Sequence, residues 1–319
     1  MKTAFVFPGQ GAQYVGMATD FMEKEPEFAA VLSNFDSVHG TELARIMAEG
    51  PEDLLKETKY TQPAILFHSL CALKSFQIRS GLRPDFVAGH SLGEFSALVA
   101  NGTLDWSDAL HLVHKRGEFM IEANAGVPFA MAAVIGLDAQ TVLDICAEAE
   151  ATGLVRAVNF NTLTQTVISG TESGVAKASE LARAQGAKRV LPLVVGGPFH
   201  TPLIHQASEW LIREMKDIEF KDAEIPLVSN LDALPNTVGA VSREKLGLQI
   251  ISPVLWVDCV RRMIDGGVGR FIEFGPQKVL GGMIKNIDKD VQIFNLDKLA
   301  DLDALLEALS AGQDTNEPE

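Results

Sequence analysis

The sequence predicts an α/β protein with a small subdomain inserted into a larger one. Short apolar segments alternate along most of the chain with longer segments whose apolar residues recur every three or four positions, a pattern typical of strands followed by amphipathic helices. The middle of the chain departs from this alternation and follows the order β-α-β-β-α-β, which is typical of a ferredoxin-like module. With 319 residues and 47% hydrophobic residues, the chain can bury a substantial core.

The first third of the chain predicts two strands and four helices. Residues 3–7 form an apolar run that ends at Pro8-Gly9, so they predict a strand leading into a glycine loop. A second short strand is expected at residues 85–89. Apolar residues at spacings of three and four predict the helices, which cover residues 20–35, 62–79, 92–100 and 106–123.

The middle of the chain predicts the inserted subdomain, residues 126–195. Its strands are expected at residues 129–135, 154–159, 165–169 and 188–194, and its helices at residues 138–150 and 172–185, with Gly186 as a stop signal. Gly196-Gly197-Pro198 marks the return to the larger domain. The larger domain is therefore expected to comprise residues 1–125 and 196–310.

The last third predicts further helices and strands of the larger domain. The expected helices cover residues 203–215, 243–250, 256–265, 279–287 and 299–309, and the expected strands cover residues 225–229, 270–274 and 291–296. Residues 311–319 are polar and acidic, so they predict a disordered tail.

Charge and cysteine content argue against several classes of function. The net charge of −15 does not favour binding to nucleic acid or to an anionic membrane surface. No apolar run has the roughly 18 to 20 residues that span a bilayer, and residues 3–7 are too short for a signal peptide. Three widely spaced cysteines predict neither disulfides nor a zinc site. We therefore expect a soluble, cytoplasmic protein without a metal.

The sharpest motif is Gly89-His90-Ser91-Leu92-Gly93, between a predicted strand and a predicted helix. This Gly-x-Ser-x-Gly pattern is typical of a nucleophile elbow, a tight turn that presents a serine hydroxyl above the sheet. The same residues also fit a capping box, in which Ser91 caps the helix and Glu94 bonds back to it. Both interpretations stay open at this point, although a capping serine does not need a glycine on each side.

A nucleophilic serine needs a base, and seven histidines are available. His200 lies in the proline-containing loop that follows the inserted subdomain, a place where catalytic groups concentrate, although it could simply cap the next helix. His111 and His114 share a helix face and could bind a metal, but no third ligand is evident and a polar stripe explains them as well. His90 is expected to point to the opposite side of the strand end from Ser91.

The loop Gly9-Gln10-Gly11 follows the first strand directly. It matches neither a phosphate-binding Walker loop nor the dinucleotide-binding pattern, so a plain glycine turn is one interpretation. If Ser91 is a nucleophile, the loop can instead supply an amide that stabilises the oxyanion of acyl transfer.

Together with the serine and histidine motifs, this loop completes a recognisable set. Five motifs in register resemble the malonyl-CoA:acyl carrier protein transacylases and their relatives in polyketide synthases, and the resemblance covers nearly the whole chain. The motifs are Phe7-Pro8-Gly9-Gln10-Gly11-Ala12-Gln13, Gly89-His90-Ser91-Leu92-Gly93-Glu94, Lys115-Arg116-Gly117, Gly197-Pro198-Phe199-His200 and Gln249-Ile-x-x-Pro253-Val-x-Trp256.

The resemblance implies an α/β-hydrolase-like large domain, in addition to the ferredoxin-like insert, and a ping-pong malonyl transfer. Ser91 is expected to form a malonyl ester with His200 as general base, and the phosphopantetheine thiol of an acyl carrier protein is expected to accept the group. The amides of Gln10 and Leu92 would form the oxyanion hole, and the backbone carbonyl of Gln249 would orient His200. No bound cofactor is implied, and the substrate is malonyl-CoA.

The resemblance also implies residues that select the substrate. Arg116 is expected to bind the free carboxylate of malonate through two hydrogen bonds and to reject acetyl groups, although an arginine on a helix is usually solvated. Phe199 is expected to crowd an α-methyl branch. Asn161, with Asn159, is expected to border the substrate cleft unless the two are ordinary turn residues.

The carrier protein is expected to be acidic, like this chain, so docking requires a local basic patch. Candidate residues are Lys188, Arg189, Arg261, Arg262 and Lys285, each of which could equally be solvated surface charge. We expect a monomer in fatty-acid or polyketide synthesis. Two alternatives stay open: a serine esterase or thioesterase, although its histidine would follow an acid late in the chain, and a non-catalytic docking module that kept the fold.

Overall fold

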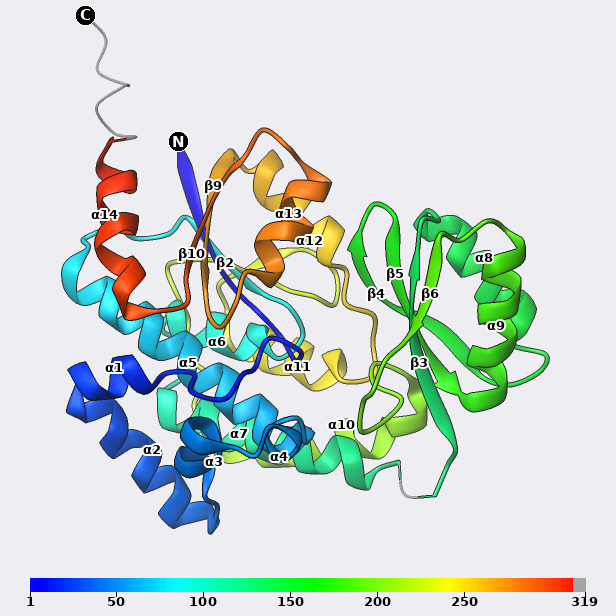
Figure 1. Ribbon diagram of the computed structural model, residues 1–319, viewed down its shortest axis with the longest axis horizontal. Helices are drawn as coiled ribbons and strands as arrows, with labels where there is room; N and C mark the ends of the chain where they lie inside the picture. Colours follow the sequence, from blue (N-terminus) through cyan, green and yellow to red (C-terminus); the bar gives the residue numbers. More distant parts are fainter. Residues whose placement is uncertain (125, 312–319) are drawn as a thin grey trace, which may run out of the picture.

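The computed structural model describes residues 1–124 and 126–311, and it divides into two sheets with separate layers of helices (Figure 1). The larger sheet has six strands in the order β10-β9-β1-β2-β7-β8. All of its neighbouring pairs are parallel except β7 with β8. These strands are β1 (Lys2–Phe7), β2 (Phe86–Gly89), β7 (Leu227–Val228), β8 (Pro235–Asn236), β9 (Val268–Phe274) and β10 (Gln292–Leu296).

Helices pack against both faces of the six-stranded sheet, and β1 shows why. Its successive side chains point to opposite faces. Phe5 and Phe7 join the core beneath helices α5 and α6, whereas Ala4 and Val6 join the core beneath α12 and α13. Both faces of β1 are therefore buried, which explains why residues 3–7 form an apolar run without alternation.

The helices outside residues 126–195 fall in three stretches of the chain. The first stretch contains α1 (Thr19–Lys24), α2 (Pro26–His39), α3 (Leu43–Glu49), α4 (Glu52–Leu55), α5 (Thr58–Arg79), α6 (Gly93–Ala100) and α7 (Trp106–Glu122). The second contains α10 (His205–Glu214), α11 (Gly239–Gln249) and α12 (Trp256–Asp265), and the third contains α13 (Val279–Ile287) and α14 (Leu302–Ala311). Short 3-10 turns at Pro202–Ile204, Met215–Asp217 and Leu299–Asp301 adjoin α10 and α14.

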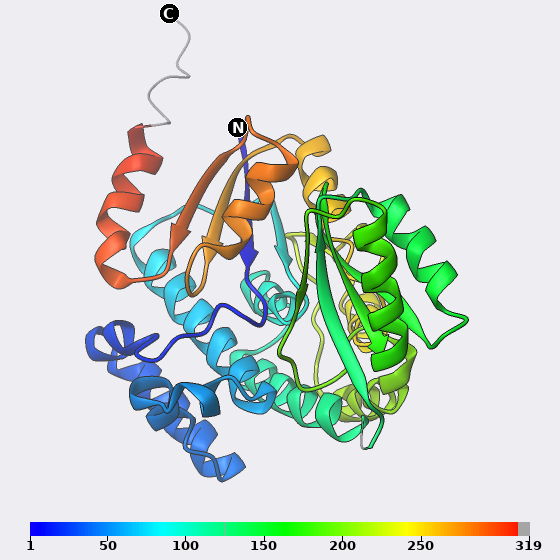
Figure 2. The ribbon, with the colours of Figure 1, turned by 45° about the vertical axis from the view of Figure 1, so that its right-hand side comes forward.

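The smaller sheet is antiparallel, in the order β4-β5-β3-β6. Its elements follow one another as β3 (Phe129–Ile135), α8 (Ala139–Ala149), β4 (Val155–Thr162), β5 (Gln165–Thr171), α9 (Glu172–Ala184) and β6 (Arg189–Pro192). Helices α8 and α9 cover the face of this sheet that is turned away from the larger domain (Figures 1 and 2). The opposite face contributes Met131, Ala133 and Val167 to the core of the larger domain.

Strand β4 also ties the two sheets together through the backbone. The N–H of Phe160 donates to the carbonyl of Val254 at 3.0 Å, and the N–H of Val254 donates to the carbonyl of Val158 at 2.8 Å. Val254 follows helix α11 closely in the chain, so the small sheet is joined to the segment of the larger domain that surrounds His200.

The structure differs from the predicted elements in several places. The helix expected at residues 20–35 is two helices, because Glu25 is extended before Pro26, and the residue before a proline disfavours the helical region. Helix α5 begins at Thr58, four residues earlier than expected, and α3, α4 and the two-residue β8 were not predicted. Ala311, assigned to the tail, ends α14, and the rest of the predicted tail lies outside the described residues.

Candidate active site

Ser91 stands at a tight turn between β2 and α6, as the motif predicts. Its φ of 50° is in the left-handed region, which is uncommon for a residue with a side chain. A Cβ on Gly89 would lie 1.9 Å from the backbone of Gly93, and a Cβ on Gly93 would lie 2.1 Å from the carbonyl oxygen of Phe7. The two glycines are therefore needed because the strand, the helix and β1 approach so closely.

The capping-box alternative is wrong in this structure. The helix cap at Leu92 receives no side-chain hydrogen bond, and the hydroxyl of Ser91 lies 2.9 Å from His200 Nε2. Glu94 is buried and does not reach back to Ser91; the backbone N–H of Ser91 donates instead to Asn230 Oδ1 at 2.7 Å. The hydroxyl is thus available for chemistry.

His200 lies beside Ser91, and its own backbone is the second one at the site in the left-handed region, with a φ of 61°. Its Nδ1 lies 3.0 Å from the backbone carbonyl of Gln249 and 3.1 Å from that of Ser252. Carbonyl oxygens only accept hydrogen bonds, so Nδ1 carries the proton and Nε2 presents its lone pair to Ser91. The Gln249 carbonyl was expected from the sequence, whereas Ser252 was not.

Burial and charge keep the imidazole neutral. His200 is 5% exposed, and desolvation lowers its pKa to about 3, with a further lowering from the nearby charge of Arg116. The two backbone carbonyls oppose this shift only in part. At neutral pH His200 is therefore unprotonated and able to accept the proton of the Ser91 hydroxyl.

Arg116 is buried at the same point rather than solvated, with 2% of its surface exposed. Its Nη2 donates to Ser91 Oγ at 3.0 Å and to Gln249 Oε1 at 3.1 Å, and its Nη1 donates to Gln62 Oε1 at 2.8 Å. Its Nε makes no hydrogen bond to any described residue. Burial lowers the pKa of Arg116 to about 10, so the guanidinium is still a cation at neutral pH.

Ser91, Arg116 and His200 line a cavity of about 190 Å³ between the two sheets. Gln10, Leu92, Phe199, Asn159 and Asn161 also line it, together with apolar residues of β3, β5 and α13. The backbone amides of Gln10 and Leu92 donate no hydrogen bond within residues 1–124 and 126–311. Two donors without an acceptor beside a serine hydroxyl can stabilise an oxyanion.

The sequence predicts that His90 points away from Ser91, but in the structure His90 belongs to the site. It lines the same cavity, and its Nε2 lies 2.7 Å from Asn161 Oδ1. Its ring also packs against Trp256 in an edge-on arrangement. The alternation of side chains along a strand does not extend through the left-handed turn at Ser91, which explains the error.

Two residues at the site carry no signal in the sequence, and the role of a third is not evident from its motif. Gln62 and Asn230 contact Arg116 and Ser91 across 54 and 139 positions of the chain, respectively. Glu94 belongs to a motif, but nothing in that motif shows that its carboxylate accepts hydrogen bonds from Gln249 Nε2 and from the backbone N–H of Asn230.

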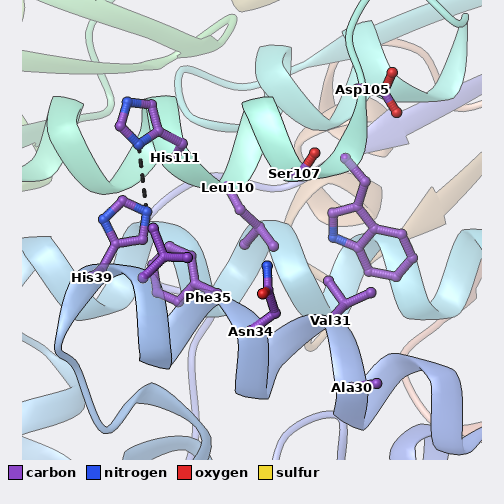
Figure 3. A pocket seen from close by; sticks show the side chains of 11 residues that line it. Ala30, Val31, Asn34, Phe35, His39, Asp105, Ser107, Leu110 and His111 are labelled. Carbon is purple, nitrogen blue, oxygen red and sulfur yellow. Dashed lines mark hydrogen bonds between the residues drawn. The ribbon is translucent and has the colours of Figure 1, made fainter.

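A larger cavity of about 590 Å³ lies elsewhere, between helices α2 and α7 (Figure 3). We call it the α2–α7 groove; Val31, Phe35 and Leu110 form part of its wall, and His39 and His111 stand at one end. His39 Nε2 lies 3.4 Å from His111 Nδ1, and His111 Nε2 lies 2.6 Å from Glu214 Oε1. His114 packs against His39 as well.

The described part of the chain contains neither a candidate metal site nor a candidate membrane-spanning helix. Across residues 1–124 and 126–311, which include His39, His111 and His114, no group of three or more His, Cys, Asp or Glu side chains could hold a metal ion. Among the same residues, no helix is long and apolar enough to cross a bilayer.

Comparisons with known proteins agree with the motifs. The model of the acyl transferase domain family matches residues 4–294. The malonyl CoA-acyl carrier protein transacylase of Bacillus subtilis (strain 168) is 44% identical over 289 residues, which are 90% of this chain and 91% of that protein.

Solved structures are similar over nearly the whole chain. The acyl-carrier-protein S-malonyltransferase of Burkholderia pseudomallei 1710b superposes with a TM-score of 0.92 at 42% identity, covering 96% of this chain and 100% of the other. A malonyl-transacylase solved in complex with its type II polyketide synthase acyl-carrier protein (PlMCAT:AntF, holo) gives a TM-score of 0.92 at 36% identity, covering 97% and 100%.

Proposed function

Because the chain belongs to the acyl transferase domain family, we propose that it transfers a malonyl group from malonyl-CoA to the phosphopantetheine thiol of an acyl carrier protein. The observation that carries this proposal is the convergence of Ser91, His200 and a buried arginine on one cavity. A buried cation with an unpaired N–H favours a substrate with a carboxylate, and malonyl-CoA has one at the far end of its acyl group.

The first half of the reaction forms a malonyl-serine ester. His200 Nε2 takes the proton of the Ser91 hydroxyl as its oxygen attacks the thioester carbonyl, and the amides of Gln10 and Leu92 stabilise the oxyanion that results. The tetrahedral intermediate then expels the thiol of coenzyme A, which receives the proton from His200. Arg116 holds the malonate carboxylate throughout, and its hydrogen bond to Ser91 helps to orient the hydroxyl.

The second half reverses these steps with a different thiol. His200 deprotonates the phosphopantetheine thiol of the carrier protein, and the thiolate attacks the ester carbonyl over the same two amides. Collapse of the intermediate returns the proton to Ser91. Because carbonyls hold Nδ1, the pair needs no carboxylate to orient the imidazole.

Phe199 and Asn161 complete the proposed site. Phe199 is buried next to His200 in the chain and lines the cavity, which supports a role in crowding an α-methyl branch. Asn161 is held by His90 at the cavity wall. We assign Phe199 to substrate selection, and Asn161 to the lining that borders the acyl group.

The domain organisation is proposed on the same basis. Residues 1–125 and 196–310 would form an α/β-hydrolase-like domain, and residues 126–195 a ferredoxin-like subdomain, which the strand order β4-β5-β3-β6 with two helices on one face supports. We further propose a cytoplasmic monomer that needs no bound cofactor and serves fatty-acid or polyketide synthesis.

Docking of the carrier protein is proposed to use a local basic patch. Lys188, Arg189, Arg261 and Arg262 are exposed and available to an acidic partner. Lys285 is a weaker candidate, because its Nζ donates to the backbone carbonyls of Lys289 and Val291. Reversing one of the available charges should slow transfer to the carrier protein but spare transfer to free pantetheine; equal effects on both acceptors would exclude docking as the cause.

Intact-mass analysis after mixing with malonyl-CoA tests the proposed function. We expect a covalent malonyl adduct that is absent from Ser91→Ala and that disappears rapidly when the phosphopantetheinylated carrier protein is added. Rapid loss of the adduct to water alone would identify a thioesterase instead. No adduct in the unchanged protein would favour the non-catalytic alternative.

A further inference from the structure

The side chain of Gln249 contacts Ser91, Glu94 and Arg116, although the proposed mechanism uses only its backbone carbonyl. Its Nε2 donates to the backbone carbonyl of Ser91 at 2.9 Å and to Glu94 Oε2 at 2.8 Å. Its Oε1 accepts from Arg116 Nη2 at 3.1 Å. The residue is completely buried, so no water replaces these partners.

These partners determine which way the amide of Gln249 points. A backbone carbonyl accepts only, and Glu94 Oε2 already accepts the N–H of Asn230 at 3.1 Å. Both hydrogens of Nε2 are therefore committed, and the amide oxygen must face Arg116. Gln62 Oε1 also accepts a hydrogen bond from Arg116 Nη1. The two amide oxygens therefore hold the guanidinium in one plane before a substrate enters.

Glu94 supplies the charge at the other end of this arrangement. Its carboxylate is 1% exposed and lies one side chain away from Arg116, with Gln249 between them. Burial raises the pKa of Glu94, and the hydrogen bonds from Gln249 and Asn230 oppose that shift. The ionised carboxylate in turn raises the pKa of Arg116 against the effect of burial on the arginine. A carboxylate in direct contact would occupy the guanidinium, whereas the intervening amide leaves the Nε–H without a partner among the described residues.

We propose that Glu94 and the side chain of Gln249 form a positioning relay that holds Arg116 in place at the wall of the acyl cavity, and thereby selects acyl groups that end in a carboxylate. This inference rests on the proposed function. Neither residue of the relay needs to touch the substrate, so both act through Arg116.

Two substitutions test the relay. Gln249→Met keeps the backbone carbonyl that orients His200 but removes the amide that donates to Glu94 and accepts from Arg116. Glu94→Gln keeps the shape of the side chain and one accepting oxygen but removes the charge. The measurement is kcat and KM of each variant for malonyl-CoA and acetyl-CoA, with the carrier protein as acceptor. Ser96→Ala is a matched control, because this buried hydroxyl on the same helix makes no hydrogen bond within the described ranges.

For Gln249→Met we expect the malonyl-to-acetyl ratio of kcat/KM to fall by about 10- to 100-fold, mainly through a higher KM for malonyl-CoA. For Glu94→Gln we expect a fall of at least about threefold, and for Ser96→Ala an unchanged ratio. A merely structural role would lower kcat/KM equally for malonyl-CoA and acetyl-CoA and leave their ratio unchanged, and that result would overturn the relay. If Gln249→Met shows no cooperative melting transition, Glu94→Gln decides the question. Failure of the unchanged protein to transfer malonyl groups would contradict the proposed function instead.

Discussion

The cavity at Ser91 and the α2–α7 groove both contain histidines with depressed pKa values, yet among the described residues only the cavity at Ser91 has a histidine hydrogen-bonded to a hydroxyl. Burial lowers the pKa of His39 in the groove to about 4, and that of His200 to about 3. The groove is also the larger space, about 590 Å³ against about 190 Å³. Neither the volume nor the titration of a histidine therefore identifies the active site.

The difference lies in what each imidazole faces. His200 presents a lone pair to a hydroxyl, and its other nitrogen is held by two carbonyls. In the groove, His39 Nε2 faces the Nδ1 of His111. The other nitrogen of His111 faces the carboxylate of Glu214. A base is useful only where its free nitrogen meets a group that it can activate.

The largest effect is expected for His200→Ala. Without the imidazole, the Ser91 hydroxyl has no base, and the rate of its acylation by malonyl-CoA should fall by at least about 1,000-fold. The burst of coenzyme A released in the first turnover measures this rate, and the melting temperature serves as a control for folding. A loss of less than about tenfold would remove His200 from the mechanism.

Arg116→Ala removes the cation from the cavity. We expect kcat/KM for malonyl-CoA to fall by about 100-fold or more, because the malonate carboxylate would be buried without a partner. The kcat/KM for acetyl-CoA should fall much less, so competition between the two substrates measures the change in selectivity. Malonyl transfer that survives with only a small loss would contradict the specificity argument.

Phe199→Ser tests the smaller discrimination by shape. One methyl group in a tight pocket is worth about 1 to 3 kcal/mol, so the ratio of methylmalonyl to malonyl turnover should rise by about 5- to 160-fold. Parallel assays with the two CoA esters give this ratio. An unchanged ratio would exclude Phe199 as a selector.

The pH dependence of Ser91 acylation is expected to be flat from pH 8 to pH 5. The active form of His200 is the neutral one, and because its pKa is lowered to about 3, protonation removes the base only near that pH. Single-turnover rates with malonyl-CoA over this range test the sign and size of the shift. A decline centred near pH 6.5 would show that the imidazole has an ordinary pKa.

The smallest effect is expected for His111→Ala in the α2–α7 groove. Malonyl transfer should change by less than about twofold, because His111 contacts no group of the active site. The partly exposed pair with Glu214 is worth about 0.5 to 1 kcal/mol of the free energy of unfolding, which denaturant titration measures. A loss of activity comparable to that of His200→Ala would mean that the groove takes part in the reaction.

The elements between residues 129 and 192 and the turn at Ser91 were predictable from the sequence because local chemistry defines them. The strand expected at residues 129–135 matches β3, and the helix expected at residues 138–150 differs from α8 by one residue at each end, with Asp138 as its cap. The glycines around Ser91 predict a close approach of backbones that the structure contains. Errors occurred where such signals are weak, as at the short α3 and α4.

The sequence by itself determined the alternation of elements, the turn at Ser91 and, by resemblance to a family, the candidates His200 and Arg116. Only the tertiary structure decided that Arg116 is buried, that Gln62 and Gln249 hold it, and that Asn230 clamps the elbow. The physical reason is distance along the chain. Periodicity and turn signals act over a few residues, whereas these hydrogen bonds join side chains that only the packing of the two sheets and their helices brings together.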